Sequence, residues 1–107
     1  MVLVNKKVAM DYLMGNELIF QRVKDSFLNS YQQFLSDYES LNATKDKNAA
    51  FNYIHSLKGI SLNLGAEALY QAASVAVDSL KKELWIQEHI DSFFKTLEMT
   101  YNELKTL

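Results

Sequence analysis

The chain has 107 residues, of which 49% are hydrophobic, and it carries a formal net charge of −2 with no cysteine and no proline. Disulfide bonds are therefore excluded, and the lack of a basic tract argues against nucleic acid as a partner. No apolar run approaches the roughly 20 residues that a transmembrane helix needs, so we expect a cytoplasmic protein without a membrane partner. The length predicts a single domain that spans residues 1–107.

Few helix-breaking residues interrupt the chain, and the first of them separate a short helix from a long one. Residues 4–14 are predicted to form the first helix, which Gly15 ends. Asn16 is a favoured N-cap residue and predicts the start of the second helix, which is expected to run to about Tyr38. The core stripe of this helix consists of Phe20, Val23, Phe27, Tyr31, Phe34 and Tyr38.

The rest of the chain is predicted to hold three more helices. Residues 40–47 are expected to form a loop, in which Thr44 or Asp46 caps the third helix. That helix is predicted to stop at Gly65, a fourth follows it directly, and the last covers residues 86–104. Together these elements predict an all-α fold: an antiparallel four-helix bundle with an additional short N-terminal helix.

Within the third helix, one stripe of apolar or small residues predicts which side faces the core. Its members alternate between spacings of four and three: Ala50, Ile54, Leu57, Ser61 and Leu64. His55 lies one residue, or about 100° of helical turn, beyond Ile54. We therefore expect the imidazole at the edge of the stripe or outside it, where a ring nitrogen reaches water.

Two neighbours of His55 suggest a chemical role. Lys58 and Gly59 follow it by three and four positions and so lie on the same surface of the helix. Glycine inside a helix costs about 1 kcal/mol relative to alanine, so Gly59 needs a reason. It leaves the space beside the imidazole open, or else it permits close packing of helices. Lys58 is either an ordinary solvated charge or a cation near an anion on His55. The combination suits a covalent phosphate on a histidine nitrogen.

A histidine followed by Lys58 and Gly59 at these offsets, and ten positions on by a Gly-Ala pair, resembles the signature of histidine-containing phosphotransfer (HPt) domains. The resemblance extends to the size of the chain and to its helical layout. It implies that His55 is the phosphoacceptor, that Lys58 helps hold the phosphoryl group and that Gly59 gives access. The next position is often small in the family and here is Ile60, so the packing behind the site is expected to differ.

The resemblance also implies a function. His55 would accept a phosphoryl group from an aspartate of a receiver domain and pass it to another receiver in a two-component phosphorelay. The expected partners are response-regulator receiver domains, a hybrid sensor kinase, or both, and the chain is expected to be a monomer. No cofactor or metal is expected on the chain, because the Mg²⁺ of the reaction sits on the receiver.

The sequence predicts a phosphoryl carrier without autonomous kinase activity. It contains no glycine-rich phosphate loop. Sensor kinases often have an acidic residue after the phosphorylated histidine, and here that position is Ser56.

The partner surface is expected to surround the histidine. Helix geometry places Phe51, His55, Lys58, Gly59 and Leu62 on one strip, with two large apolar residues as candidate contacts for the receiver. The alternative is that the bundle covers Phe51 and Leu62 as part of its core.

Two other functions compete with phosphotransfer. The first is a non-phosphorylated helical adaptor, which binds a signalling partner through the His55 face. The second is a metal-binding bundle, which would use His55 and His89 and fits poorly because paired Glu-x-x-His motifs are missing. His89 is expected to be an ordinary surface histidine.

Overall fold

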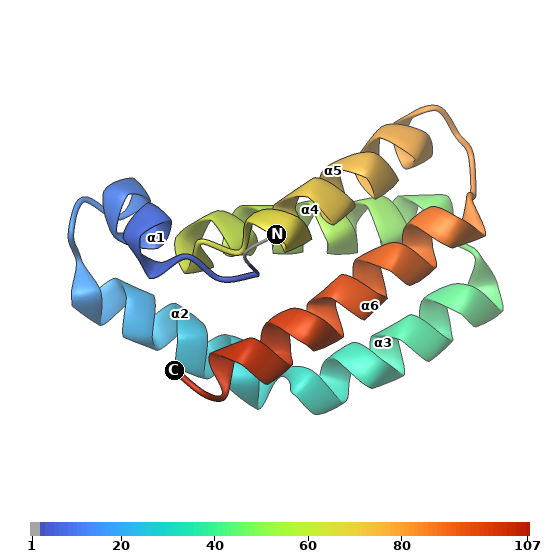
Figure 1. Cartoon of the computed structure of the whole chain (residues 1–107). Coiled ribbons are helices and arrows are strands. Elements are labelled where there is room, and N and C mark those ends of the chain that lie inside the picture. The colour runs from blue at the N-terminus through green and yellow to red at the C-terminus, as the bar shows by residue number, and fades with distance from the viewer. Residues whose placement is uncertain (1–2) are drawn as a thin grey trace.

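The computed structural model describes residues 3–107, and in this range the fold is entirely helical, as predicted (Figure 1). None of the helices in this range is long and apolar enough to cross a membrane. The helices follow one another as α1 (Lys6–Tyr12), α2 (Glu17–Asn29), α3 (Tyr31–Thr44), α4 (Lys47–Leu64), α5 (Glu67–Lys81) and α6 (Gln87–Leu104).

Helix α4 lies at the centre of the packing. A tight turn joins it to α5, and these two helices share the most extensive contact, while α5 packs in turn against α6. Helix α2 contacts both α4 and α6, and α1 lies beside the C-terminal end of α4 (Figure 1). All six helices contribute to one core, whose largest fully buried apolar side chains are Phe20, Ile54, Leu64, Leu69, Ile90, Phe93, Leu97 and Leu104.

The predicted second helix is interrupted at Ser30, so the expectation of one continuous helix was wrong. α2 ends just before this residue and α3 begins just after it. The Ser30 hydroxyl donates to the carbonyl of Ser26 at 2.8 Å, and back-bonding of this kind often bends helices. Phe27 and Phe34 are both buried on either side of the break, with ring centroids 5.2 Å apart. The bend therefore coincides with a close aromatic contact in the core.

Helix α3 continues to Thr44, so the loop expected over residues 40–47 is shorter than predicted. Leu41 is buried and holds the last turn of α3 against the core. Lys45 caps the C-terminal end of the helix: its φ of 50° is left-handed, and its backbone N–H donates to the Leu41 carbonyl. Asp46, one of the two predicted caps, accepts a hydrogen bond at 3.1 Å from a backbone N–H in the first turn of α4.

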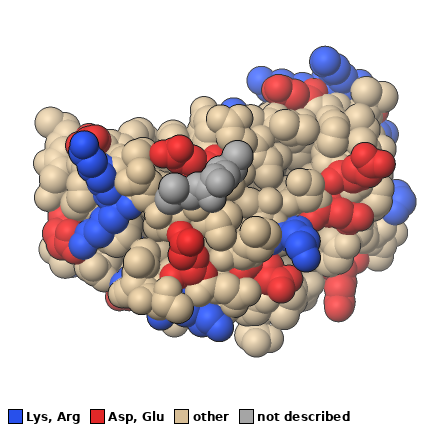
Figure 2. All heavy atoms as spheres, viewed as in Figure 1, with Lys and Arg blue, Asp and Glu red and all other residues tan. Residues whose placement is uncertain are grey.

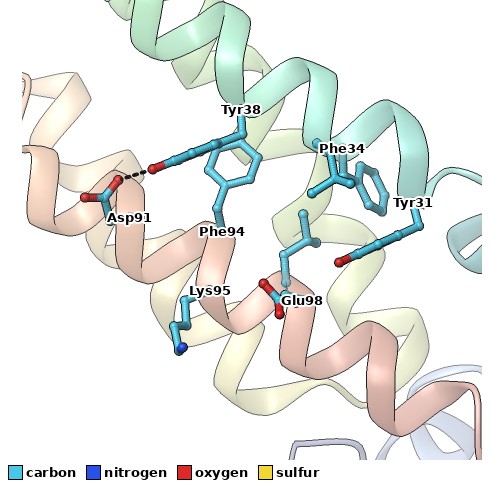
Figure 3. Close-up of a pocket in the computed structure, with 9 residues that line it drawn as sticks. Tyr31, Phe34, Tyr38, Asp91, Phe94, Lys95 and Glu98 are labelled. Atoms are coloured by element: carbon cyan, nitrogen blue, oxygen red, sulfur yellow. Dashed lines mark hydrogen bonds between the residues drawn. The ribbon is translucent and has the colours of Figure 1, made fainter.

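Side chains of α3 and α6 face each other across a groove of about 330 Å³ (Figure 3). The Tyr38 hydroxyl donates to Asp91 at 2.8 Å, and this bond to a carboxylate raises the pKa of Tyr38. Phe94 meets the Tyr38 ring edge-on, with centroids 4.8 Å apart. All residues that line the groove belong to α3 or α6, so it is separate from the histidine of α4.

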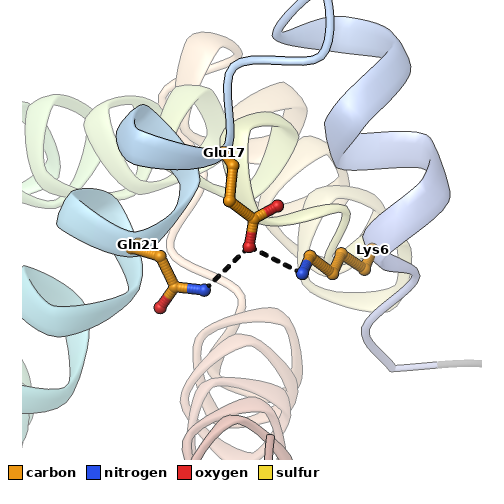
Figure 4. Close-up of polar contacts among 3 residues, drawn as sticks. All are labelled: Lys6, Glu17 and Gln21. Atoms are coloured by element: carbon orange, nitrogen blue, oxygen red, sulfur yellow. Dashed lines mark hydrogen bonds and ion pairs between the residues drawn. The ribbon is translucent and has the colours of Figure 1, made fainter.

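Exposed polar contacts join α1 to α2. The Lys6 ammonium lies 2.7 Å from a Glu17 carboxylate oxygen, which also accepts a hydrogen bond from the Gln21 amide at 3.0 Å (Figure 4). The bond from Lys6 lowers the pKa of Glu17. Because water surrounds both partners, the pair contributes little to stability. Basic and acidic side chains are interspersed over the face shown in Figure 2.

The turn between α4 and α5 makes a closer contact with the segment before α1. Gly65 ends α4 as predicted, with a left-handed φ of 65°. The Asn5 N–H donates to the Gly65 carbonyl at 2.9 Å, and a Cβ on Gly65 would overlap the Asn5 carbonyl oxygen. Both the backbone conformation and this contact therefore require glycine.

We predict that Gly65→Ala lowers the free energy of unfolding by about 2 to 5 kcal/mol. A Cβ in the left-handed region costs about 1–2 kcal/mol, and displacement of the Asn5 backbone adds about 1–3. Gly15→Ala is the matched control, because Gly15 has a φ of 78° but a Cβ there would have no atom within 4 Å beyond the adjacent residues. It should lose only about 1–2 kcal/mol. Denaturant titrations measure both losses, and equal losses would contradict the importance of the Asn5 contact.

Candidate functional site

The rotation of α4 about its axis is set by the residues that it buries. Ile54, Ser61 and Leu64 are fully buried and Leu57 is nearly so, which confirms the predicted stripe. The Ser61 hydroxyl is satisfied within the helix, because it donates to a backbone carbonyl one turn earlier at 2.6 Å. His55 follows Ile54 by one position, and its side chain is exposed. The imidazole therefore lies outside the core, as the spacing predicts.

A shallow cleft of about 170 Å³ lies next to this imidazole. Its lining consists of His55, Lys58, Gly59 and Leu62 from α4 and Tyr70 from α5. Four of the five residues predicted for the strip around the histidine thus border one hollow. Lys58, Leu62 and Tyr70 are half-buried, whereas His55 and Gly59 are exposed. The cleft is open to an incoming molecule on the side of the imidazole.

Phe51, the fifth residue of the predicted strip, contacts the histidine from one turn earlier on α4. The rings of Phe51 and His55 are stacked, with centroids 5.6 Å apart and an interplanar angle of 16°. Phe51 is half-buried and packs against the core, so it is neither a freely exposed contact nor a fully covered core residue. Its ring limits the orientations that the imidazole can adopt.

The structure distinguishes the two reasons considered for Gly59. A Cβ at this position would have no atom within 4 Å beyond the neighbouring residues and its own helix backbone. Gly59 therefore does not permit close packing against another helix. Instead it borders the cleft beside His55 and leaves that side of the imidazole open.

Lys58 contacts an aromatic ring of the adjacent helix. Its ammonium lies over the face of Tyr70, 5.2 Å from the ring centroid, which is within the range of a cation–π interaction. Within residues 3–107, no carboxylate forms an ion pair with Lys58. The cation is therefore held beside the cleft by an aromatic face rather than by an opposite charge.

Tyr70 is the cleft residue that the sequence reasoning missed. It follows the fully buried Leu69, just as His55 follows Ile54, so both side chains lie next to a core position. A short turn between two antiparallel helices brings residues on either side of it opposite each other, and Leu62 and Tyr70 flank this turn closely. The position of Tyr70 shortly after this turn is therefore the signal from which the α5 side of the cleft could have been inferred.

The second histidine is not the ordinary surface residue that we expected. His89 is half-buried near the start of α6, and its Nδ1 is within hydrogen-bond distance of the Ser79 hydroxyl on α5. It links two helices and does not line the cleft at His55. Across residues 3–107, no group of three or more potential metal-ligating His, Cys, Asp or Glu side chains comes together.

Comparison with known proteins places the chain in a family. The family model for the Hpt domain matches residues 22–106, which include the whole of α4 and the cleft. The chain therefore belongs to the Hpt domain family. Among curated proteins and among solved structures, no significant match was found. Helix α1 lies outside the matched range.

Membership has a functional meaning at the level of the family. Hpt domains take part in histidine phosphotransfer in phosphorelays, and they generally interact with receiver domains of response regulators or with hybrid kinases. The exposed histidine and its cleft lie on a helix that the family match contains entirely.

We predict that Gly59→Ala raises the free energy of unfolding by about 0.5–1 kcal/mol. Alanine favours the interior of a helix by this amount, and the open space around Gly59 offers no steric penalty. A thermal or denaturant melt against the unsubstituted protein measures the change. Loss of stability would contradict the open geometry and would indicate that another element packs against this position.

Proposed function

We propose that this protein is a histidine phosphotransfer protein of a two-component phosphorelay. His55 accepts a phosphoryl group from an aspartate of one receiver domain and passes it to an aspartate of another. The observation that carries the proposal is the cleft itself: an exposed imidazole with open space at Gly59 and a cation at Lys58, on the helix matched to the Hpt family.

The transfer is a displacement at phosphorus. An unprotonated ring nitrogen of His55 attacks the phosphorus of the receiver's aspartyl phosphate, forming an N–P bond while the P–O bond to the aspartate breaks. The aspartate leaves as a carboxylate, with no change of oxidation state and no other reactant. The reverse displacement on a second receiver regenerates the free imidazole. Catalysis here consists of positioning and charge compensation, because such transfers need little covalent chemistry from the protein.

Three residues around His55 have a part in this scheme. Phe51 stacks on the imidazole and orients it, Gly59 leaves room for the phosphoryl group, and Lys58 offsets its negative charge. A lysine about 4 Å from the phosphate would offset roughly 1 kcal/mol per unit charge in bulk water, or about 4 at an effective dielectric of 20. Because the cleft is open to water, the lower value applies better, so Lys58 tunes the transfer and is not indispensable.

The phosphoryl group has to come from another protein. The sequence contains neither a Gly-x-x-x-x-Gly-Lys nor a Gly-x-Gly-x-x-Gly phosphate-binding motif, and Ser56 replaces the acidic residue that often follows the histidine of a sensor kinase. We therefore propose a carrier without kinase activity of its own. Its partners are response-regulator receivers, a hybrid sensor kinase, or both, with the Mg²⁺ bound on the receiver.

The receiver docks over the strip around His55. It must reach across the imidazole to deliver its phosphate, and half-buried Phe51 and Leu62 offer apolar contact area on either side. In this proposal the protein acts as a cytoplasmic monomer, and residues 1–107 form one domain.

The fold supports a bundle like the one predicted. We treat α2 and α3 as one bent helix, which forms an antiparallel four-helix bundle with α4, α5 and α6, while α1 is the additional N-terminal helix. In this arrangement α4 presents His55 at the surface between its neighbours.

Substitution of the acceptor tests the proposal directly. His55→Gln should abolish acid-labile phosphorylation by a phosphorylated receiver, because glutamine has no nucleophilic ring nitrogen. Circular dichroism should show unchanged helicity, since this side chain is exposed. His89→Gln is the matched control and should label normally. Normal labelling of His55→Gln would contradict the assignment. Loss of labelling in His89→Gln alone would contradict it as well. A protein that binds receivers but never accepts phosphate would instead be the helical adaptor.

The open side of the cleft can be filled without disturbing the core. Gly59→Leu should fold stably and yet block phosphoryl transfer, because its side chain would occupy the space that the phosphate needs. Gly59→Ala adds only a methyl group and should retain more of the transfer rate. Single-turnover labelling from a phosphorylated receiver compares the two variants. Transfer to Gly59→Leu at the unsubstituted rate would show that clearance at this position is unnecessary.

A further inference from the structure

The α5 wall of the cleft has no part in the scheme above. Tyr70 is half-buried, and its ring is the surface on which the Lys58 ammonium rests, 5.2 Å from the centroid. Tyr70 borders the same hollow as His55 and Gly59. A residue on one helix therefore holds the cation of another helix beside the proposed phosphoacceptor.

The position of the Tyr70 ring is determined by its surroundings. Leu69 is fully buried and sets the rotation of α5, which leaves the next side chain at the edge of the core. The Tyr70 backbone N–H donates to the Ala66 carbonyl at 2.9 Å, and the Tyr70 carbonyl accepts from the Ser74 hydroxyl at 2.9 Å. The Tyr70 backbone is thus hydrogen-bonded at both its N–H and its carbonyl, in the first turn of α5 after the α4–α5 connection.

The Lys58 side chain, by contrast, needs an external restraint. A lysine has four flexible side-chain bonds, and fixing them has an entropic cost. Within residues 3–107, Lys58 has no carboxylate partner, so the cation–π contact with the Tyr70 ring is what restrains its ammonium. An aromatic face attracts a cation more weakly than a doubly charged phosphate does, so the ammonium can move to the phosphate when it arrives.

We propose that Tyr70 is a positioning residue, whose ring holds the Lys58 ammonium at the cleft before the phosphoryl group arrives. This inference rests on the proposed phosphotransfer function. Part of the ordering of Lys58 is then complete before transfer, which lowers the cost of reaching the charged transition state. Tyr70 touches neither the phosphate nor the imidazole in this role and acts only through Lys58.

The ring and the hydroxyl of Tyr70 can be separated by two substitutions. Tyr70→Phe keeps the aromatic face and should transfer at the unsubstituted rate. Tyr70→Leu removes the face and should slow single-turnover transfer to His55 about 2- to 5-fold, equivalent to about 0.4–1.0 kcal/mol at 1.4 kcal/mol per decade. If Tyr70→Phe is as slow as Tyr70→Leu, the hydroxyl acts directly and the positioning role is overturned.

A general structural role of Tyr70 would not depend on the lysine, so a double-substitution cycle tests the coupling. In a Lys58→Met background, Tyr70→Leu should have no further effect on the rate, because the cation that the ring positions is gone. An equal slowing in both backgrounds would overturn the proposal. Thermal melts of all variants check that the differences in rate do not reflect unfolding.

One measurement needs no phosphate and keeps this inference separable from the proposed function. In NMR spectra, the Lys58 side-chain methylene protons next to the ammonium should show ring-current shifts in the unsubstituted protein and in Tyr70→Phe, but not in Tyr70→Leu. Absence of these shifts in the unsubstituted protein would contradict the contact itself. If the unsubstituted protein accepts no phosphate from any receiver, the proposed function fails. If it labels normally and Tyr70→Leu labels as fast, only the role of Tyr70 fails.

Discussion

The burial of one stripe of α4 is the constraint on which the rest of the site depends. Ile54 and Leu64 are completely removed from water, and burying side chains of this size contributes about 1.5–3 kcal/mol each. Rotation of α4 about its axis would expose them, so the helix has one favourable orientation in the core. With that orientation set, the helical period turns His55 and Gly59 outward, where they line the cleft together with Tyr70 of α5.

The interactions around the cleft are individually weak, and this suits the proposed role, in which a phosphoryl group is accepted and then given away. An aromatic face restrains Lys58 by roughly 0.5–1 kcal/mol at an exposed site, and stacking on Phe51 orients the imidazole of His55. A strong buried ion pair would have to be broken before the lysine could meet a phosphate. Weak contacts would order the site without opposing either direction of the proposed transfer.

The errors of the sequence reasoning occurred where side-chain packing outweighed local signals. The break at Ser30 has no glycine or proline to mark it in the sequence. The bend instead combines a hydrogen bond from the Ser30 hydroxyl to the backbone of the preceding turn with the burial of Phe27 and Phe34. The polar residues after Tyr38 suggested a loop. α3 nevertheless continues, because Leu41 is buried and stabilises one further turn. A short polar stretch has too little local preference to decide between helix and loop without such a contact.

The sequence by itself determined the helical class, the helix stop at Gly65 and the outward position of His55 with its two neighbours. These features depend on the helical period and on backbone preferences, which act within a few residues of the chain. Only the tertiary structure decided that Tyr70 faces Lys58, and that the turn after α4 lies against the backbone of Asn5. Those contacts join different segments, so they depend on how the helices pack and not on local propensity.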